Sequence, residues 1–451
     1  MRLIDALDLR RSDVVAFVGA GGKTSAMFRL ADELVASGWR VVTTTTTRIA
    51  QDEMAHAPQQ IGVGPAIRLP ETVARMVEQY QHVFLFTKVE ADQKVHGFRP
   101  AWLDDNLAGV PFLDALLVEA DGSRRLPLKA PLPHEPALPA SATVVMPVIG
   151  LSALGKPLDD QNVYGAEMIY DVIGYPLESP ITEQLLSAIL VNPQLGLKNI
   201  PPGARVIPLL NQVTAENLAS ARQVAEYVLT EPHIERVLIG AVQGPEPVWE
   251  VHRRVGAIVL AAGQSKRMGS QKMVLPWGDK TIIRQVCQQV CASPVHDVVV
   301  ITGENDALVR EQLDGLRLRV VNNPRAAQGE MLSSLQTGVD ALWGTCEACL
   351  VVLGDQPTIQ QEIINRVLSA YTQGLGRIIA PSYNKRRGHP LLIDRAFWTD
   401  LKNLPKNKAP RDLLRANENA VYHLEVDTDS ILRDIDTPED YNQARQSAGL
   451  G

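Results

Sequence analysis

The sequence predicts an α/β protein of two domains. Short β-rich apolar runs alternate with amphipathic stretches along most of its 451 residues, a pattern typical of largely parallel sheets covered by helices. This length exceeds what one ordinary hydrophobic core supports. Two different glycine-rich loops, at residues 19–25 and 260–272, each follow an apolar run and give the chain two separate centres. We therefore predict an N-terminal domain over residues 1–245, a linker over 246–254 and a C-terminal domain over 255–451.

Composition excludes several classes of protein. The net charge of −7 argues against general binding of nucleic acids, whose phosphate backbone requires a positive surface. No N-terminal stretch has the pattern of a secretion signal and no run approaches the roughly 20 apolar residues of a membrane helix, so we expect a cytoplasmic protein without a membrane partner. Four cysteines do not suggest a disulfide framework, and the single CxxC pair, Cys346 and Cys349, lacks the further ligands of a zinc site.

The first half opens with a strand, a glycine-rich loop and a helix. Val14–Val18 is a β-rich run, GAGGKTS follows at residues 19–25, and an amphipathic stretch covers Met27–Val35. Such a loop presents backbone amides, a lysine ammonium and a threonine hydroxyl to phosphate groups, and the hydroxyl suits a Mg²⁺ contact. The predicted P-loop-like phosphate site consists of Gly19, Gly21, Gly22, Lys23 and Thr24, with the acids Glu119 and Asp121 that are introduced below.

This loop departs from two standard nucleotide-binding patterns. The Walker A spacing places its first glycine where this chain has Phe17, and a GxGxxG fingerprint needs a glycine where Thr24 stands. The next strand, Arg40–Thr43, runs into threonines 43–47 instead of an acid that would hold a ribose. The sequence therefore predicts a variant phosphate loop and argues against NAD. The threonine run is either a strand end or a second wall of the phosphate site.

Further strands are expected at Val83–Thr87, Ala115–Val118, Thr143–Val148, Val206–Leu210 and Val237–Ala241. One of them ends in Glu119 and Asp121, which is similar to a Walker B arrangement in which an acid holds Mg²⁺. Each acid taken alone is equally consistent with a solvated strand end. The segment LLNQVT at residues 209–214 is similar to the NKxD guanine-reading motif, but Gln212 and Thr214 replace its lysine and aspartate. We therefore do not expect a GTPase.

Five motifs of the first half occur together: GAGGKT, the threonine run, EADGS, the KAP and HEP loop at residues 129–139, and GLSALGKPL at residues 150–158. As a set they resemble the selenium-dependent hydroxylase accessory protein family (YqeC-like), and the resemblance covers nearly all of residues 1–245. It implies a P-loop-like domain that assists maturation of a molybdenum hydroxylase, whose apo-enzyme would be a partner. It implies no defined reaction.

The second half is organised around LAAGQSKRMGSQK at residues 260–272, which follows the apolar run Gly256–Val259. Small residues leave the backbone amides uncovered, so phosphate oxygens can approach them, and the basic side chains neutralise charge. The alternative is an ordinary strand-to-helix turn with basic residues in solvent.

This loop resembles the signature LA(A/G)GxSxRMGxxK of the molybdenum-cofactor nucleotidyltransferases. The matching positions are Leu260, Ala261, Gly263, Ser265, Arg267, Met268, Gly269 and Lys272. The resemblance implies a Rossmann-like nucleotidyltransferase domain, similar to nucleotide-diphospho-sugar transferases. It also implies nucleotide contacts at Leu260, Ala261, Ala262 and Gly263, and catalytic roles for Arg267 and Lys272, which would hold the triphosphate.

The elements that follow place further polar side chains. Ile282–Val290 is predicted as a helix, Val298–Thr302 as a strand, residues 319–324 as a strand that ends in a turn, and residues 328–338 as the start of a helix. In that helix the hydroxyls of Ser333 and Ser334 would reach a nucleobase or sugar, with helix capping as the alternative.

Two acidic motifs suggest a metal site. The strand Leu350–Leu353 ends in GDQP, and a carboxylate at the carboxyl end of a parallel strand is the expected position of a Mg²⁺ holder. The family resemblance implies that Asp355 is a catalytic metal ligand and that Asp436, in DIDTPEDY, is the second ligand. Asp434 is the less favoured candidate, and both acids of that motif have the alternative of capping the helix that starts at Pro438.

The acceptor side rests on a second motif. PSYNKRRGHP at residues 381–390 resembles the family's GHP motif near the pterin site, which implies substrate contacts at Arg387 and His389. Arg411 follows in NLPKNKAPRDLL as a third candidate. For the lysines of that segment, solvated charge is the alternative to a phosphate contact.

The resemblance implies that Ala262 helps decide which nucleotide is used. Cytidylyl enzymes of this family have LAAG in the signature loop and guanylyl enzymes have LAGG, and this chain has LAAG. A methyl group in place of hydrogen narrows the base pocket and favours a pyrimidine. We therefore expect transfer of a cytidylyl group from CTP to a molybdopterin-type cofactor, with Mg²⁺, giving the cytosine dinucleotide form and pyrophosphate. The alternatives are a guanylyl or sugar-phosphate nucleotidyltransferase, or a cofactor-delivery chaperone without turnover.

Overall fold

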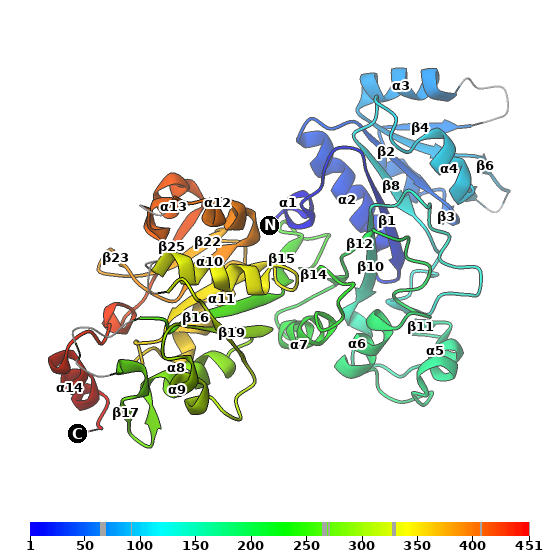
Figure 1. Cartoon of the computed structure of the whole chain (residues 1–451). Helices are drawn as coiled ribbons and strands as arrows, with labels where there is room; N and C mark the ends of the chain where they lie inside the picture. The colour runs from blue at the N-terminus through cyan, green and yellow to red at the C-terminus, as the bar shows by residue number, and fades with distance from the viewer. Residues whose placement is uncertain are drawn as a thin grey trace. The chain divides into compact units, whose positions relative to one another are not determined.

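The computed structural model describes residues 1–63, 69–91, 93–263, 268, 271–326, 331–405 and 408–450. The chain divides into two compact units, Met1–His252 and Arg253–Gly451. Each unit has a sheet of its own with helices packed on it (Figure 1), which confirms the predicted α/β class. Within the described part of the chain, none of the helices combines the length and apolar character needed to cross a bilayer.

The first unit is built on a ten-stranded sheet in the order β15-β14-β13-β10-β1-β8-β2-β5-β4, with β12 beside β10. Its strands are β1 (Asp13–Gly19), β2 (Val41–Thr45), β4 (Gln59–Gly62), β5 (His82–Phe86), β8 (Ala115–Glu119), β10 (Val144–Gly150), β12 (Arg205–Val206), β13 (Leu209–Asn211), β14 (Arg236–Gly240) and β15 (Val248–Arg253). The pairs β1 with β8, β1 with β10 and β2 with β8 are parallel, so their carboxyl ends lie at one edge of the sheet.

Helices and short strands complete the first unit. The helices are α1 (Leu3–Leu7), α2 (Lys23–Ala36), α3 (Leu69–Tyr80), α4 (Pro100–Asn106), α5 (Ala166–Ile173), α6 (Glu183–Val191) and α7 (Leu218–Val228). A three-stranded sheet contains β3 (Arg48–Ala50), β7 (Lys94–His96) and β6 (Lys88–Val89), and a two-stranded one pairs β9 (Leu128–Lys129) with β11 (Val163–Tyr164).

The second unit is built on an eight-stranded sheet in the order β20-β19-β16-β21-β24-β22-β23, with β25 beside β22. Its strands are β16 (Val255–Leu260), β19 (Asp297–Thr302), β20 (Arg319–Asn322), β21 (Ala348–Leu353), β22 (Ile378–Tyr383), β23 (Arg386–Arg387), β24 (Leu391–Asp394) and β25 (Val421–Glu425), and β17 (Pro276–Trp277) and β18 (Lys280–Thr281) form a hairpin. The helices are α8 (Ile282–Cys291), α9 (Asp306–Gln312), α10 (Met331–Leu342), α11 (Gln361–Thr372), α12 (Trp398–Lys402), α13 (Pro410–Ala416) and α14 (Pro438–Ser447).

Central strands of both units are buried on both faces. In β1, Val15 and Phe17 join one hydrophobic cluster and Ala16 joins the cluster on the opposite face. In β16, Val259 and Ile258 divide between two clusters in the same way. Alternating side chains of a strand point to opposite faces, and a parallel sheet covered by helices therefore has continuous apolar strands.

Two predicted segments differ from the structure. The strand expected over residues 206–210 is split into β12 and β13, because Pro208 lies between them and has no amide hydrogen to donate. The residues expected to form a linker, 246–254, instead contain strand β15, which lies beside β14 at the edge of the first sheet. Valine and tryptophan at its start favour a strand, although two prolines precede them.

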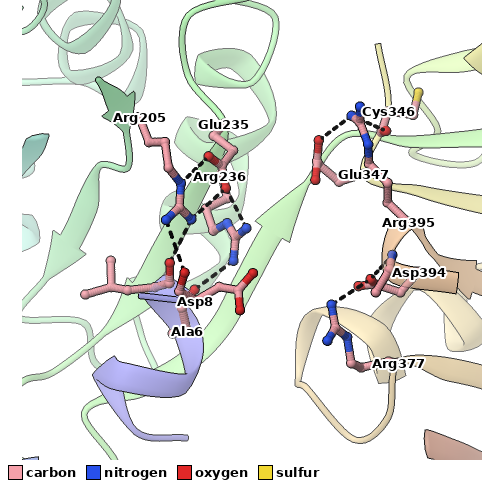
Figure 2. A network of polar contacts seen from close by, with 12 residues as sticks. Ala6, Asp8, Arg205, Glu235, Arg236, Cys346, Glu347, Arg377, Asp394 and Arg395 are labelled. Carbon is pink, nitrogen blue, oxygen red and sulfur yellow. Dashed lines mark hydrogen bonds and ion pairs between the residues drawn. The ribbon is translucent and has the colours of Figure 1, made fainter. Parts of the chain in front are cut away.

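Arginine ion pairs and hydrogen bonds connect neighbouring elements within each unit (Figure 2). In the first, Arg205 binds Glu235 and the carbonyl of Asp8, and Arg236 donates to the carbonyl of Ala6, which ties helix α1 to the sheet. Burial acts to raise the pKa of Glu235, but the two arginines outweigh it and lower that pKa to about 2.

In the second unit the corresponding pairs hold β24 and its neighbours. Arg377 binds Asp394 at 2.9 Å and Arg395 binds Glu347 at 3.0 Å (Figure 2). The hydroxyl of Tyr371 also donates to Asp394, at 2.7 Å. These contacts connect β22, β24, α11 and the turn before β21.

Candidate functional site

The edge of the second sheet brings two predicted motifs together. Strands β16 and β21 are parallel neighbours, and Leu260 at the end of one is paired with Leu353 at the end of the other. The amide of Gly354 donates to the carbonyl of Leu260 at 3.0 Å. The signature loop and the GDQP motif therefore leave the sheet side by side, as expected for a ligand crevice at the carboxyl ends of parallel strands.

Lys272, Asp355 and Asp436 form one charged cluster at this edge. The Lys272 ammonium is hydrogen-bonded to Asp355, to Asp436 Oδ1 at 3.1 Å and to the carbonyl of Ile435 at 3.1 Å. Burial acts to lower the pKa of Lys272, but the two carboxylates outweigh it and raise that pKa. Three residues from three distant motifs thus converge, and the lysine stays charged.

The neighbouring acids of the DIDTPEDY motif have other partners. Asp434 accepts from the amide of Gln356, a residue that is 1% exposed. Helix α14 is capped by Thr437 and Asp440 through a reciprocal capping box. Of the two candidates in this motif, Asp436 is therefore the one that reaches the lysine.

The donor set at this cluster fits Mg²⁺. Two carboxylates, from Asp355 and Asp436, converge on one positive charge, and Mg²⁺ in nucleotide enzymes is held by one or two carboxylates together with water and substrate phosphates. No cluster of three or more metal-binding side chains occurs in the portion of the chain that the structure describes. The remaining ligand positions would belong to water and phosphate oxygens.

The two serines of α10 are placed by a residue that the sequence did not single out. Asn323, which is 2% exposed and follows β20, donates to the hydroxyls of Ser333 at 3.0 Å and Ser334 at 3.1 Å. Ser334 is itself buried, whereas Ser333 is partly accessible. The only signal for Asn323 is its position in the NNP turn after a strand. Ser334 therefore fastens α10 to the turn, and Ser333 is the better placed of the two for a ligand.

The signature loop is described only in part. Leu260 and Ala261 are buried, Ala262 is partly accessible and Gly263 is exposed. The amide of Ala261 donates to the carbonyl of Ile301 at 2.8 Å, so it serves the sheet edge. The predicted triphosphate contact Arg267 and the signature positions Ser265 and Gly269 lie outside the described residues.

The three predicted acceptor residues lie on separate elements. Arg387, on β23, pairs with Glu418 at 2.6 Å. His389 follows it, and burial lowers the pKa of its ring to about 4, so the ring is neutral at pH 7. Arg411 is an exposed residue of α13. No hydrogen bond or ion pair joins these three side chains within residues 271–326, 331–405 and 408–450.

The glycine loop of the first unit connects β1 to α2 and packs on β10. Gly21 has a φ of +83°, and a Cβ atom there would collide with the backbone of Gly150. The amides of Gly19, Ala20 and Gly21 already donate to Asp121, Val148 and Leu126. Backbone amides that could serve the predicted phosphate site therefore begin at Gly22, at the start of α2, and the earlier glycines serve the loop's conformation.

Lys23 turns into the loop. Its ammonium donates to the carbonyl of Gly19 at 2.7 Å and pairs with Asp121 at 3.2 Å, and the side chain is 2% exposed. Asp121 also lies 3.5 Å from Lys129, which pairs with Glu135. The predicted phosphate lysine is thus neutralised within the protein.

Thr24 and Glu119, both assigned to the predicted phosphate site, are in direct contact. The threonine hydroxyl donates to Glu119 at 2.7 Å, and the Lys23 ammonium lies 3.9 Å from the same carboxylate. Burial raises the pKa of Glu119 to about 7, against the opposing effects of Lys23 and Thr24. Neither Glu119 nor Asp121 is a solvated strand end, since they are 5% and 2% exposed.

Threonines 43–47 mainly fasten the strand end. The hydroxyls of the first four contact His82, the carbonyl of Leu85, the carbonyl of Glu119 and the carbonyl of Ala137. Thr46 and Thr47 also line a cavity at this edge. Thr43, Thr44 and Thr45 therefore fit the interpretation as a strand end, and Thr46 and Thr47 fit the interpretation as a wall of the cavity.

Asn211, in the segment that resembles a guanine-reading motif, clamps three parts of the first unit. Its amide donates to the carbonyl of Gly21 at 2.8 Å, and its oxygen accepts from the amide of Val242 at 3.0 Å. The next residue, Gln212, bonds Ser152. The motif thus holds the glycine loop in place.

Comparison with known proteins assigns the two parts of the chain to different families. Residues 15–167 match the YqeC protein family, and residues 257–421 match the MobA-like NTP transferase domain. The chain is 35% identical over 242 residues to uncharacterized protein YqeC of Escherichia coli (strain K12), a match that covers 53% of this chain and 92% of that protein.

Two relatives match the second half. Molybdenum cofactor cytidylyltransferase of Escherichia coli (strain K12) is 30% identical over 196 residues, which cover 43% of this chain and 96% of that protein. Nicotine blue oxidoreductase of Paenarthrobacter nicotinovorans is 30% identical over 194 residues, covering 41% and 93%. The chain therefore belongs to the YqeC protein family in its first half and to the MobA-like NTP transferase family in its second, and it is a nucleotidyltransferase.

Proposed function

We propose that the second unit transfers the cytidylyl group of CTP to a molybdopterin-type cofactor. The observation that carries this proposal is the convergence of Lys272, Asp355 and Asp436 at the carboxyl ends of β16 and β21. The molybdenum cofactor cytidylyltransferase among its relatives supports the choice of acceptor.

The reaction needs alignment more than acid–base chemistry. A phosphate oxygen of the acceptor attacks the α-phosphorus of CTP, the bond to the β-phosphate breaks, and pyrophosphate leaves with the electron pair. The nucleophile is already an anion, so no strong base is required. Lys272 and Arg267 are the two cations proposed to offset the charge of the triphosphate.

Mg²⁺ is the proposed metal, held by Asp355 and Asp436. When bound, it neutralises the charge that develops between the attacking and leaving oxygens. In the structure the Lys272 ammonium lies between these two carboxylates. The lysine therefore prevents their mutual repulsion, and it must share them with any metal that binds.

The nucleotide preference rests on Ala262. Its side chain is partly accessible at the strand edge, and its methyl group takes space that a purine would need. The proposed contacts to base and sugar are Leu260, Ala261, Ala262, Gly263, Ser333 and Ser334, with Ser333 better exposed than Ser334. The proposed acceptor contacts are Arg387, His389 and Arg411.

Fusion to the first unit suggests where the product goes. We assign residues 1–252 an accessory role in maturation of a molybdenum hydroxylase, with the apo-enzyme of that hydroxylase as partner. This assignment is supported by the pairing of a YqeC half with a nucleotidyltransferase half in one chain.

Pyrophosphate release measured with each of the four NTPs, with and without molybdopterin-type cofactor, tests the proposal. We expect release to depend on the cofactor and to be fastest with CTP. Release that is equally fast without the cofactor contradicts the proposed acceptor, and a preference for GTP contradicts the role given to Ala262. A sugar phosphate that replaces the cofactor would indicate the alternative acceptor class.

A further inference from the structure

The first unit contains a cavity of about 1100 Å³ at the carboxyl edge of its sheet. It lies over the start of α2 and is also lined by residues of β3, β7 and the loop that follows β8. This volume reaches the upper end of the roughly 300 to 1000 Å³ typical of small-molecule sites. A nucleotide-sized ligand would fit in it.

The charge of this cavity is positive. Its lining includes the cations Lys23, Arg48, Lys94, Arg99, Arg124 and Arg125 and the acids Glu53, Glu119 and Glu135. Each acid has a cation within the protein: Glu53 faces Arg125, Glu119 lies 3.9 Å from the Lys23 ammonium, and Glu135 pairs with Lys129. The acids are therefore already compensated.

Three of the arginines have no acidic partner in the described part of the chain. Arg48 belongs to β3, Arg99 precedes α4, and Arg124 lies in the loop after β8. Arg124 has a φ of +51°, and its guanidinium stacks 4.9 Å from the ring centroid of Tyr164. Three exposed guanidinium groups from three segments thus surround one cavity.

The backbone fixes two of these arginines at the cavity. The amide of Gly97 donates to the carbonyl of Thr47 at 3.1 Å, and that of Phe98 donates to the carbonyl of Thr45 at 2.9 Å. A Cβ atom on Gly97 would collide with Thr45, so this approach depends on glycine. The segment that carries Arg99 is therefore held against the strand end that leads to Arg48.

The loop lysine contributes little to this field, because Lys23 is paired with Asp121 and buried. Residues at the start of α2 line the same cavity as the arginines, and both helix-start amides and guanidinium groups favour an anion. We infer that this cavity binds a polyphosphate ester of nucleotide size, gripped by Arg48, Arg99 and Arg124 and by the first turn of α2. This site is separate from the proposed nucleotidyl-transfer site.

Two sources of such an ester fit this chemistry, a nucleoside triphosphate and the diphosphate-bridged dinucleotide form of the cofactor. The full-length chain is titrated calorimetrically with inorganic triphosphate, ATP, CTP and the dinucleotide cofactor. The Arg48→Gln/Arg99→Gln/Arg124→Gln variant is compared with Arg75→Gln, which removes an exposed arginine of α3.

We expect the triple variant to bind one equivalent of triphosphate fewer per chain, or to bind it at least about tenfold more weakly, whereas Arg75→Gln binds as the unmodified protein does. The ester that binds more tightly than inorganic triphosphate identifies the source. Unchanged binding in the triple variant, or an equal loss in Arg75→Gln, overturns the site. No gain for any ester overturns the nucleotide-sized ligand.

Nucleotidyl transfer by the same variants separates this site from the proposed function. The triple variant should keep the rate of pyrophosphate release, because none of its substitutions lies in residues 253–451. If transfer fails in every protein while the binding difference persists, the proposed function fails and this site stands.

Discussion

At the scale of single residues, the second unit depends on one lysine placed between two carboxylates. Asp355 is 15% exposed and bonded to the Lys272 ammonium. Replacing it by asparagine removes a negative charge from the place where the metal is proposed to bind. The buried Lys272 ammonium then loses one of its carboxylate partners. This residue tests the site more directly than the half-exposed Asp436 does.

We expect Asp355→Asn to slow pyrophosphate release by about 100-fold or more, because charge stabilisation at the reacting phosphate is lost. Asp340→Asn, which removes a half-exposed carboxylate of α10, serves as the control and should retain activity. A steady-state assay at saturating CTP measures both. Full activity in Asp355→Asn contradicts the catalytic role, and thermal unfolding of both variants shows whether the fold is intact.

Glu119 gives the first unit a dependence of stability on pH. Burial raises its pKa to about 7 in the folded protein, from 4.5. The folded state therefore binds more protons between these values, and the contribution of Glu119 to stability falls as pH rises from about 4.5 to about 7. Above pH 7 the penalty of the buried charge is constant.

We expect Glu119→Gln to remove this decline, which amounts to about 2 to 3 kcal/mol. Scanning calorimetry of the full-length chain at pH 5 and pH 8 measures the difference between the variant and the unmodified protein. That difference should shift in favour of the variant at pH 8. Glu78→Gln, at an exposed position of α3, should show no such shift, and a pH-independent difference for Glu119→Gln contradicts the raised pKa.

At the scale of elements, the glycine loop of the first unit packs closely against strands β10 and β13. Gly21 approaches Gly150 closely, and Asn211 holds the Gly21 carbonyl. The sequence predicted the strand, the loop and the helix, because each has a local pattern. It did not predict the Asn211 clamp, since 190 residues separate the two partners and only the sheet order brings them together.

We expect Gly21→Ala to destabilise the first unit by about 1 to 3 kcal/mol, because a Cβ atom there meets backbone and the φ is positive. Gly38→Ala is the matched control, as Gly38 has a φ of +77° but no atom within 4 Å of an added Cβ. Thermal unfolding separates backbone strain, which both variants share, from collision, which only one has. Equal shifts would show that the close approach contributes nothing.

The second unit shows the same division between local and distant information. The carboxylates of GDQP and DIDTPEDY were recognisable from the sequence as a possible metal pair. Their convergence on Lys272, however, was not readable from the sequence. Asp355 lies 83 positions and Asp436 lies 164 positions further along the chain than the lysine. Asn323 escaped notice because an asparagine in a turn usually serves the turn itself. The Thr24 to Glu119 contact was not predicted, although both residues were assigned to the same phosphate site.

At the scale of the whole molecule, each unit has its own sheet and its own hydrophobic clusters. The fold class could be predicted from the periodicity of the sequence, but the boundary between the units could not. The residues expected to connect the units form strand β15. Because the two cores are separate, we expect each unit to fold by itself.

We expect residues 253–451, produced alone, to catalyse pyrophosphate release within about threefold of the full chain, since an independent domain keeps its own site. Residues 1–252 should keep the binding of triphosphate. Both are measured with the assays described above. Transfer that requires adding residues 1–252 back would contradict independent sites and indicate that the first unit contributes to the reaction.

The clamp formed by Asn211 has a consequence for protein engineering. Both hydrogen bonds of the Asn211 side chain, to the Gly21 carbonyl and from the Val242 amide, hold parts of the first unit together. Gln212 bonds Ser152 and has a φ of +60°, so of the two replaced motif positions the exposed Thr214 is the one that can be changed without loosening the loop. Substitutions at Thr214 can therefore alter this edge of the first unit while the glycine loop keeps its support from Asn211.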